Sequence, residues 1–386
     1  MNNVHCKKDT SLTKEEKDVF TGHLKIEGLS HNIWDLFEEW VEMSTSKVKF
    51  FYLKVYQKNE LIGLGLFLKI KPLDLTTSYS RLRKNALVKK IISFISLLNS
   101  NCVYISFRNL ITSNLTRPFF YREPEMANII MKAILTYLKD EKEADMVTIV
   151  DTSRNDNHYQ KAGFNKYPSS SEAYLDATKY ADISEYLNKH RSLKKNLKRK
   201  KNVVTTEILQ GPISKNKQIQ IRECLYCSIE ESRVNTPSQK FFEDNIFETE
   251  VYNSDKYLHI FICIDNRIIG FHTFLVSGSR MGGVLGGFNR DYSRKSFAYE
   301  RVIVASLDYA IKNKIKNVQY SLVDNYTKLR LVESLEPCGL YFYSRSPMNR
   351  SVFKHTLKYN DVHELYLLEK HGLLKNSTKS VRMENT

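Results

Sequence analysis

The sequence predicts an α/β protein (α+β in detail) made of two similar units in tandem. Its 386 residues exceed what one hydrophobic core usually organises, because domains cluster near about 100 to 150 residues. A hydrophobic fraction of 42%, with 23 Tyr and 20 Phe, supplies apolar side chains for folded cores and excludes wholesale disorder. The order hairpin, helix, strand also occurs twice, about 150 residues apart. We therefore expect two mixed, twisted sheets, each flanked by helices.

Two apolar and aromatic runs open the first unit. Residues 50–56 (FFYLKVY) and 61–70 are rich in residue types that favour strands, and Asn59 and Glu60 between them suit a turn. This segment therefore predicts a β-hairpin.

A helix and a strand follow in the first unit. Residues 126–139 carry apolar side chains at the i, i+3, i+4, i+7 spacing of a helix with one buried face, and Pro124 suits its start. Residues 145–150 are typical of a short strand, which a polar loop over 151–157 and a turn over 162–164 follow.

The second unit repeats this order with clearer boundaries. Its predicted elements are strands 257–264 and 267–277 joined by a turn at Asp265 and Asn266, a Gly-rich strand 281–288, a helix 298–312 and a strand 317–322. The predicted division of the chain is an N-terminal extension 1–29, a first domain 30–181, a second domain 182–370 and a polar tail 371–386.

Composition and charge limit the function classes. Only 8 Pro and 14 Gly exclude fibrous architectures, and a net charge of +16 favours acidic partners such as phosphorylated cofactors, nucleic acid or anionic membranes. The N-terminus lacks the apolar core of a signal peptide, and the apolar stretches 61–70 and 91–98 are too short to span a bilayer. We expect a cytoplasmic protein without a membrane span.

The six cysteines do not predict a disulfide framework or a metal site. They are few and irregularly spaced, and the Cys224-x-x-Cys227 motif lacks a second such motif or a nearby His pair. Buried or idle thiols are the simpler interpretation, so we expect no metal.

The most basic stretch lies between the two units. Residues 189–201 (KHRSLKKNLKRKK) hold 8 Lys and Arg among 13 residues, with Leu187, Leu193 and Leu197 spaced along one edge of a helix. A solvated linker helix is one interpretation, and a contact for the phosphates of a cofactor or a tRNA is the other. A protein that reads nucleic-acid sequence is disfavoured, because Lys outnumbers Arg in the run and no zinc-finger or RNP signature is present.

A phosphate site is predicted where the Gly-rich strand runs into helix 298–312. Free backbone N–H groups and the positive end of the helix dipole meet there, over residues 293–299. The residues that could bind phosphate at this point are Arg290, Ser293, Arg294, Lys295 and Ser296, the two serines also being able to cap the helix. An ordinary N-cap loop is the alternative.

Two segments resemble a known family. Residues 159–202 (with YQKAGFNKY, YLDATKY and ADISEYLNKHRSLKKNLKRKKN) are similar to the junction between the two domains of FemAB-like and CelD-like proteins of the GNAT acyltransferase superfamily. Residues 267–330 (with IIGFHTFLV, GGVLGGFNRDYSRKSF, AYERVIVASLDYAIKNK and DNYTKLRL) are similar to the second domain of that family. The resemblance implies tandem GNAT domains, the first an acceptor-side scaffold and the second donor-binding and catalytic.

The resemblance also implies a reaction. It is transfer of an acyl group from acyl-CoA, above all acetyl-CoA, to the amine of a small molecule or amino sugar in a ternary complex. The usual GNAT phosphate loop, Q/R-x-x-G-x-G/A, is absent, because Gly282, Gly283, Gly286 and Gly287 lie earlier, on the strand. An aminoacyl-tRNA donor of the Fem type, acting on a cell-wall precursor, and a non-catalytic GNAT-like binding protein are therefore the alternatives.

Such a transfer needs a base for the amine and an acid for the leaving group, but no covalent intermediate. Asp324, just past strand 317–322, is the candidate base, and its alternative role is to cap the following turn. Glu300 in the first helical turn is a second catalytic candidate, although the helix dipole alone favours an acid there. Tyr326 and Lys328 match the family's Tyr-x-Lys, which implies that Tyr326 protonates a leaving thiolate or holds substrate and that Lys328 binds the cofactor. Packing is the alternative role of Tyr326. His272, inside a strand, is interpreted as a core histidine.

Overall fold

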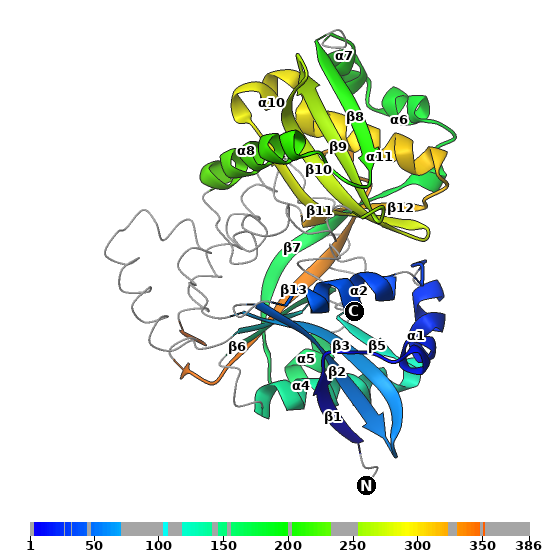
Figure 1. Cartoon of the computed structure of the whole chain (residues 1–386), viewed down its shortest axis with the longest axis vertical. Helices are drawn as coiled ribbons and strands as arrows, with labels where there is room; N and C mark the ends of the chain where they lie inside the picture. Colours follow the sequence, from blue (N-terminus) through cyan, green and yellow to red (C-terminus); the bar gives the residue numbers. More distant parts are fainter. Residues whose placement is uncertain are drawn as a thin grey trace, which may run out of the picture.

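The computed structural model describes residues 4–26, 28–31, 33–44, 48–70, 103–106, 118–140, 146–152, 156–199, 203–232, 254–322, 330–347 and 350–351. Within these residues the strands form one continuous sheet of 13 strands, with helices on both faces (Figure 1). The order across the sheet is β1-β2-β3-β4-β6-β13-β7-β12-β11-β10-β9-β8, and β5 pairs with β3.

The first half of the sheet carries helices α1, α2, α4 and α5. Its elements are β1 (Val4–Asp9), α1 (Lys14–Ile26), α2 (Ile33–Glu42), β2 (Val48–Gln57), β3 (Glu60–Ile70), β4 (Val103–Ser106), β5 (Phe119–Tyr121), α4 (Ala127–Asp140), β6 (Met146–Thr152), α5 (Asp156–Lys161) and β7 (Asn165–Asp176). The predicted hairpin is present as β2 and β3. Its turn differs from the prediction: Lys58 and Asn59 take the left-handed φ values of 50° and 68°, whereas Glu60 already belongs to β3.

The helix predicted from Pro124 onward is confirmed as a 3₁₀ turn (Pro124–Met126) that leads into α4. Its buried face is Ile130, Met131, Ile134, Leu135 and Leu138. Ile129, expected to be buried, is 45% exposed, because the face is rotated by one residue from the predicted stripe. The predicted loop 151–157 is also shorter, since β6 continues to Thr152 and α5 begins at Asp156.

The five elements predicted in the second unit are present, and only the Gly-rich strand begins one residue earlier than expected. In full, this half consists of α6 (Ile183–Lys189), α7 (Arg191–Arg199), β8 (Val204–Gln210), α8 (Lys215–Ser232), β9 (Tyr257–Ile264), β10 (Arg267–Ser277), β11 (Arg280–Phe288), α10 (Arg290–Ser296), α11 (Ala298–Lys312), β12 (Asn317–Leu322) and β13 (Ser334–Ser344). The turn of the β9–β10 hairpin lies at Asp265 and Asn266, both with positive φ, as predicted. The basic stretch is two helices rather than one, because α6 ends at Lys189 and α7 starts at Arg191.

Two long strands join the halves. β13, from the C-terminal part of the chain, lies between β6 and β7 and pairs with both of them in antiparallel fashion. β7 in turn pairs with β12 of the second half, from Asp176 to Glu172. In Figure 1 both strands run between the two ends of the molecule. The sheet of the first half is therefore completed by a strand that follows the second half in sequence.

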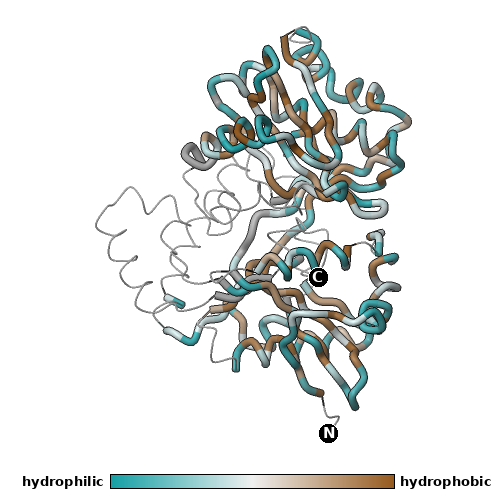
Figure 2. The backbone as a smooth tube through the Cα atoms, in the orientation of Figure 1, coloured by the Kyte–Doolittle hydropathy of each residue, from teal (hydrophilic) through white to brown (hydrophobic). Residues whose placement is uncertain are grey.

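Packing also crosses between the halves. One hydrophobic cluster includes Trp34, Leu36 and Trp40 of α2 together with Tyr257 and Leu275 of the second half. Trp40 Nε1 donates a hydrogen bond to the hydroxyl of Tyr257 at 3.4 Å. Figure 2 shows the hydrophobic segments along the strands and the helix faces turned toward them. The two halves thus share a core as well as a sheet.

Candidate donor and acceptor site

The two parallel strands of the second half separate along their length. β11 and β12 pair at three positions, the last being Gly282 with Gln319, although β11 continues to Phe288 and β12 to Leu322. Beyond that pair the facing backbone edges of the two strands no longer bond to each other. Backbone groups along such an edge can bind an extended ligand as an added strand.

β11 carries a bulge at the same point. Thr273 of β10 lies opposite Leu285 and Phe274 lies opposite Gly283, so that Val284 has no residue opposite it. The extra residue bends β11 away from the ladder. Bulges of this kind are frequent next to functional sites.

His272 of β10 lies over the glycines of β11. A Cβ added to Gly283 would lie 2.4 Å from His272 Nε2, and one added to Gly286 would lie 2.5 Å from Nδ1. The imidazole is 8% exposed, and its ring centroid is 4.6 Å from that of Phe274. His272 is therefore a buried core histidine, and its ring is the reason why β11 is rich in glycine at these positions.

A short helix, α10, replaces the loop that was predicted between β11 and α11. The Asn289 side chain caps it by accepting from the backbone N–H of Asp291 at 3.1 Å, and Ser296 Oγ donates back to the Ser293 carbonyl at 3.2 Å. The two predicted serines thus close α10 and do not cap α11. Phe297, in the left-handed region at φ 56°, joins the two helices and, as the N-cap residue of α11, makes no side-chain capping hydrogen bond.

The predicted phosphate-binding residues lie on this corner. Lys295 is exposed, Ser293 is half-buried and Ser296 is buried, while the side chains of Arg290 and Arg294 lie outside the described residues. The backbone places all five on α10. Their role in binding phosphate stays a prediction. It is supported by their position beside the N-terminus of α11.

The predicted catalytic residues are only partly described. Asp324, Tyr326 and Lys328 lie outside the described residues. Glu300 lies in the first turn of α11, where its carboxylate is 3.7 Å from the Arg330 guanidinium and its side chain is 14% exposed. The contact orients the carboxylate toward Arg330, and the catalytic role of Glu300 stays a prediction.

A buried polar cluster at the end of the β11–β12 pairing was not predicted. It consists of Glu172 and Tyr174 of β7 and Gln319 of β12, and we name it the Gln319 cluster. Gln319 Nε2 donates to Glu172 Oε2 at 2.8 Å, and the Tyr174 hydroxyl donates to the same oxygen. Glu172 is 0% and Gln319 1% exposed. In the sequence, the only sign of this cluster is that Glu172 and Tyr174 lie two residues apart in a strand. Gln319 reaches them through the pairing of β12 with β7, which the sequence does not predict.

The basic helix α7 lies against the α10–α11 corner. Arg301 of α11 donates through Nε to the Ser296 carbonyl at 3.0 Å and through Nη2 to the Leu197 carbonyl of α7 at 3.1 Å. Burial lowers the pKa of Arg301. This side chain therefore ties the end of α7 to the predicted phosphate corner.

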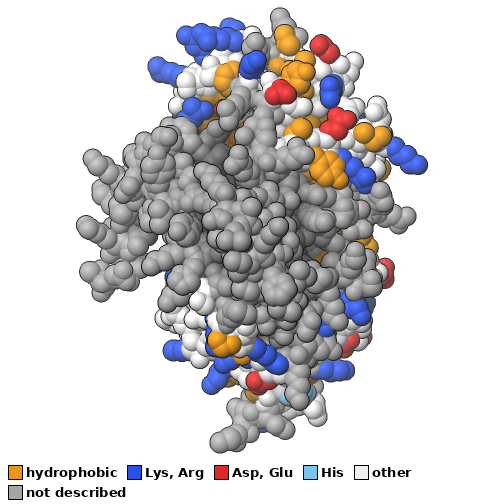
Figure 3. Space-filling model, turned by 90° about the vertical axis from the view of Figure 1, so that its left-hand side faces the viewer, with side chains coloured by type: hydrophobic (Ala, Val, Ile, Leu, Met, Phe, Trp, Pro, Cys, Tyr) orange, Lys and Arg blue, Asp and Glu red, His pale blue; other side chains and the backbone are white. Residues whose placement is uncertain are grey.

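Five cations of α7 are exposed: Arg191, Lys194, Lys195, Lys198 and Arg199. None of them has an ion pair with a carboxylate in the described part of the chain, whereas Lys217, Lys256 and Lys312 elsewhere do. Figure 3 shows Lys and Arg side chains at the upper end of the molecule, the end that α7 and α10 occupy in Figure 1.

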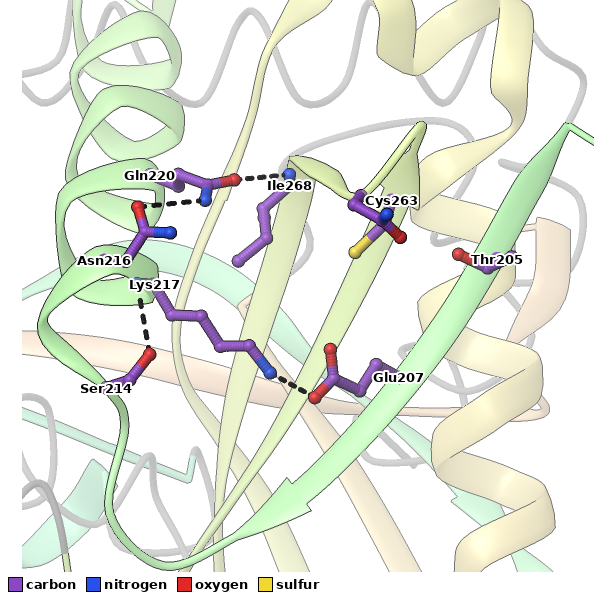
Figure 4. A pocket seen from close by; sticks show the side chains of 9 residues that line it. Thr205, Glu207, Ser214, Asn216, Lys217, Gln220, Cys263 and Ile268 are labelled. Atoms are coloured by element: carbon purple, nitrogen blue, oxygen red, sulfur yellow. Dashed lines mark hydrogen bonds and ion pairs between the residues drawn. The ribbon is translucent and has the colours of Figure 1, made fainter.

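A cavity of about 250 Å³ lies elsewhere, between α8, β8 and the β9–β10 turn (Figure 4). Lys217 of α8 and Glu207 of β8 form an ion pair across it. Cys263 also lines it, and burial raises the pKa of that thiol. Because β9 and β10 lie between β8 and β11, the cavity is separate from the β11–β12 opening.

The Cys224-x-x-Cys227 motif lies on α8. Cys224 is buried, its Sγ is 3.5 Å from the Ile268 carbonyl, and burial raises its pKa to about 12. Among the residues that the structure describes, no group of three His, Cys, Asp or Glu side chains could hold a metal ion. In the same residues no helix is long and apolar enough to cross a bilayer.

Comparison with known proteins identifies the fold. No family model and no curated protein matches the sequence. The structure is similar to a tandem GNAT protein from the clavulanic acid biosynthesis pathway, with a TM-score of 0.56 at 8% identity over 89% of this chain and 99% of that one. It is also similar to FemX, with a TM-score of 0.52 at 10% identity over 91% and 100% of the two chains.

A third similar structure is L-PGS from Bacillus licheniformis, with a TM-score of 0.51 at 12% identity over 89% of this chain and 95% of that one. The predicted resemblance to GNAT proteins is thereby confirmed at the level of the fold. The chain has the tandem GNAT fold.

Proposed function

We propose that this protein is an N-acyltransferase that moves an acyl group from acyl-CoA, in particular acetyl-CoA, to the primary amine of a small molecule or amino sugar. The observation that carries the proposal is the separation of β11 from β12 after Gly282, on the strand that leads through α10 to the start of α11. An extended donor arm fits between the two strand edges, and its phosphates fit the helix start. We place the enzyme in the cytoplasm, where acyl-CoA is supplied.

The α10–α11 corner is our candidate for the donor's phosphates. Arg290, Arg294 and Lys295 would supply charge, Ser293 and Ser296 hydroxyl groups, and Lys328 a further cation. The position of α10 supports this, since it stands where the usual Gly-rich loop is missing. Backbone N–H groups at the start of α11 add hydrogen-bond donors, and the N-cap residue Phe297 has no side-chain acceptor to compete for them.

The reaction needs no covalent enzyme intermediate. The neutral amine nitrogen attacks the thioester carbonyl, a C–N bond forms and the C–S bond breaks. Asp324 takes the amine proton, and Tyr326 gives its proton to the departing thiolate. Glu300, beside Arg330, is a further catalytic candidate at the same helix start.

A test of these roles is release of free CoA thiol from acetyl-CoA in the presence of a panel of primary amines. Asp324→Asn and Tyr326→Phe should each lower turnover by about 100-fold, the usual scale of general acid–base catalysis. Lys217→Met, at the separate cavity, is the matched control and should leave turnover unchanged. Turnover of both site variants within twofold of the wild type would contradict the assignment.

A second candidate is a Fem-type aminoacyltransferase with aminoacyl-tRNA as the donor. The exposed cations of α7, tied by Arg301 to the corner, favour it. Binding of tRNA that weakens steeply with salt, together with no acetyl-CoA binding, would select this donor. Failure of both donors to bind would leave a non-catalytic GNAT-like binding protein.

A further inference from the structure

Among the residues that the structure describes, one buried oxygen of the Gln319 side chain has no hydrogen-bond partner. Its Nε2 must face Glu172, because a carboxylate only accepts hydrogen bonds, and this turns Oε1 away from Glu172. Oε1 is buried and receives no hydrogen bond from the described residues. A buried acceptor without a donor is uncommon in folded proteins and calls for an explanation, such as a bound water, an ion or a functional role.

The Gln319 cluster lies on the face of the sheet opposite α11. Val318 and Tyr320, the neighbours of Gln319 in β12, pack in the cluster that contains α11, and the Tyr320 hydroxyl is 2.8 Å from Ser306 of that helix. Side chains alternate along a strand, so Gln319 points the other way. Tyr174, paired with Gln319, and Glu172, two residues along β7, share this second face.

That second face is turned toward the first half of the molecule. Leu275, which pairs with Gly282, packs in the cluster that includes Trp40 of α2. Gly282 itself, the partner of Gln319 on β11, adds no side chain beside the amide. The Gln319 cluster therefore lies at the last hydrogen-bonded pair before β11 and β12 separate, on the face of the sheet opposite α11.

We propose that the Gln319 cluster is the subsite that binds the acceptor's primary ammonium group. The ammonium group has three N–H donors, one of which can donate to Oε1 of Gln319, and its positive charge is complementary to the carboxylate of Glu172. Tyr174 holds the carboxylate in place. The proposal rests on the proposed acyl transfer, and it names Gln319 and Glu172 as binding residues that place the amine where a donor's acyl group would end.

The first test is ligand-detected NMR binding of n-propylammonium to the full-length protein. Tetramethylammonium is the matched probe, because it carries the same charge but has no N–H group. We expect n-propylammonium to bind and tetramethylammonium not to bind. Equal binding of the two probes, or no binding of n-propylammonium, would overturn the proposal.

The second test uses variants of β12. Gln319→Met keeps the length of the side chain and removes its acceptor, and n-propylammonium should then bind about tenfold more weakly or worse. Tyr320→Phe, the adjacent residue on the other face, is the control and should bind as the wild type does. Unchanged binding by Gln319→Met would overturn the proposal. Gln319→Leu is a second variant in case the first fails to fold, as judged by circular dichroism.

Acetyl-CoA titration of the same samples separates this subsite from the proposed function. We expect Gln319→Met to bind acetyl-CoA within twofold of the wild type. If the wild type binds n-propylammonium at Gln319 but not acetyl-CoA, the subsite stands and the donor assignment fails. If acetyl-CoA binds and Gln319→Met binds n-propylammonium as the wild type does, the donor assignment stands and the subsite fails.

Discussion

At the scale of single residues, His272 and the glycines of β11 depend on one another. The sequence alone could predict that His272 is buried, because Phe271 and Phe274 flank it in a strand. It could not predict why Gly283 and Gly286 are glycines. That reason is the imidazole ring on the neighbouring strand, within 2.4 and 2.5 Å of the positions that Cβ atoms would take.

Gly283→Ala should therefore lower the free energy of unfolding by about 1–3 kcal/mol, the usual cost of overpacking. Gly22→Ala, inside α1 with no atom within 4 Å of the added Cβ, should be neutral or stabilising by up to about 1 kcal/mol. Urea denaturation measures both. The cost of Gly283→Ala should shrink in a His272→Ala background, and an unchanged cost there would mean that the ring is not the obstacle.

A second residue-scale feature is the pair of carboxylates around Lys54, whose side chain is 4% exposed. Its Nζ lies 3.1 Å from Asp9 Oδ2 and 2.7 Å from Glu16 Oε2. Burial by itself would raise the pKa of both carboxyl groups, but the hydrogen bonds and charge of Lys54 outweigh it and hold each pKa below its usual value.

A lowered pKa means that the folded state binds protons less readily than the unfolded state. The two carboxylates therefore contribute stability above their unfolded pKa values of about 4, and this contribution is lost as the pH falls through the lower folded values. Lys54→Met should flatten the acid limb of the stability profile measured by urea denaturation between pH 6 and about 2. Lys7→Met, which removes an exposed cation 3.8 Å from Asp9 Oδ2, should keep most of that limb, because exposed ion pairs contribute little. An acid limb as steep in Lys54→Met as in the wild type would rule out this origin.

At the scale of elements, the sequence predicted strands and helices correctly where turn residues and hydrophobic periodicity indicate the same boundaries. The β9–β10 hairpin, α11 and β12 have the predicted bounds, because Asp265, Asn266 and the apolar spacing act within a few residues. α10 was missed, since its seven residues are polar and its cap, Asn289, serves equally well in a loop. The break between α6 and α7 at His190 was also missed, because the sequence around it is polar and basic throughout.

Arg301 bonds the Leu197 carbonyl of α7 and so helps to hold that helix in place, and Arg301→Met should loosen it. Amide hydrogen exchange should speed up across Arg191–Arg199, because the bond to the Leu197 carbonyl is lost, while β9 and β10 should exchange as before. Arg267→Met, which breaks an exposed pair with Glu223, is the control. Unchanged exchange in α7 would show that packing of Leu193 alone suffices.

At the scale of the whole molecule, the two halves are not independent. β13 completes the sheet of the first half although it follows the second half in sequence. No local pattern could predict this, because the residues of β13 indicate a strand but not its partners. The division at residues 181 and 182 therefore stays a prediction about function, while the sheet itself is continuous across it.

Residues 1–181 produced alone should not fold, because β6 and β7 would lack the strand that lies between them. Far-ultraviolet circular dichroism should show little ordered structure for this fragment, and co-expression with residues 182–386 should restore it. Cooperative unfolding of the isolated fragment would contradict the shared-strand arrangement.

The central claim is that a phosphorylated acyl donor binds between β11 and β12 with its phosphates at the α10–α11 corner. Isothermal titration with acetyl-CoA, of the wild type and of the Arg294→Ala, Lys295→Ala double variant, tests it most directly. We expect saturable one-site binding that weakens about tenfold or more in the variant, since two charge-assisted contacts are lost. Absence of binding by the wild type, or equal binding by the variant, would contradict it.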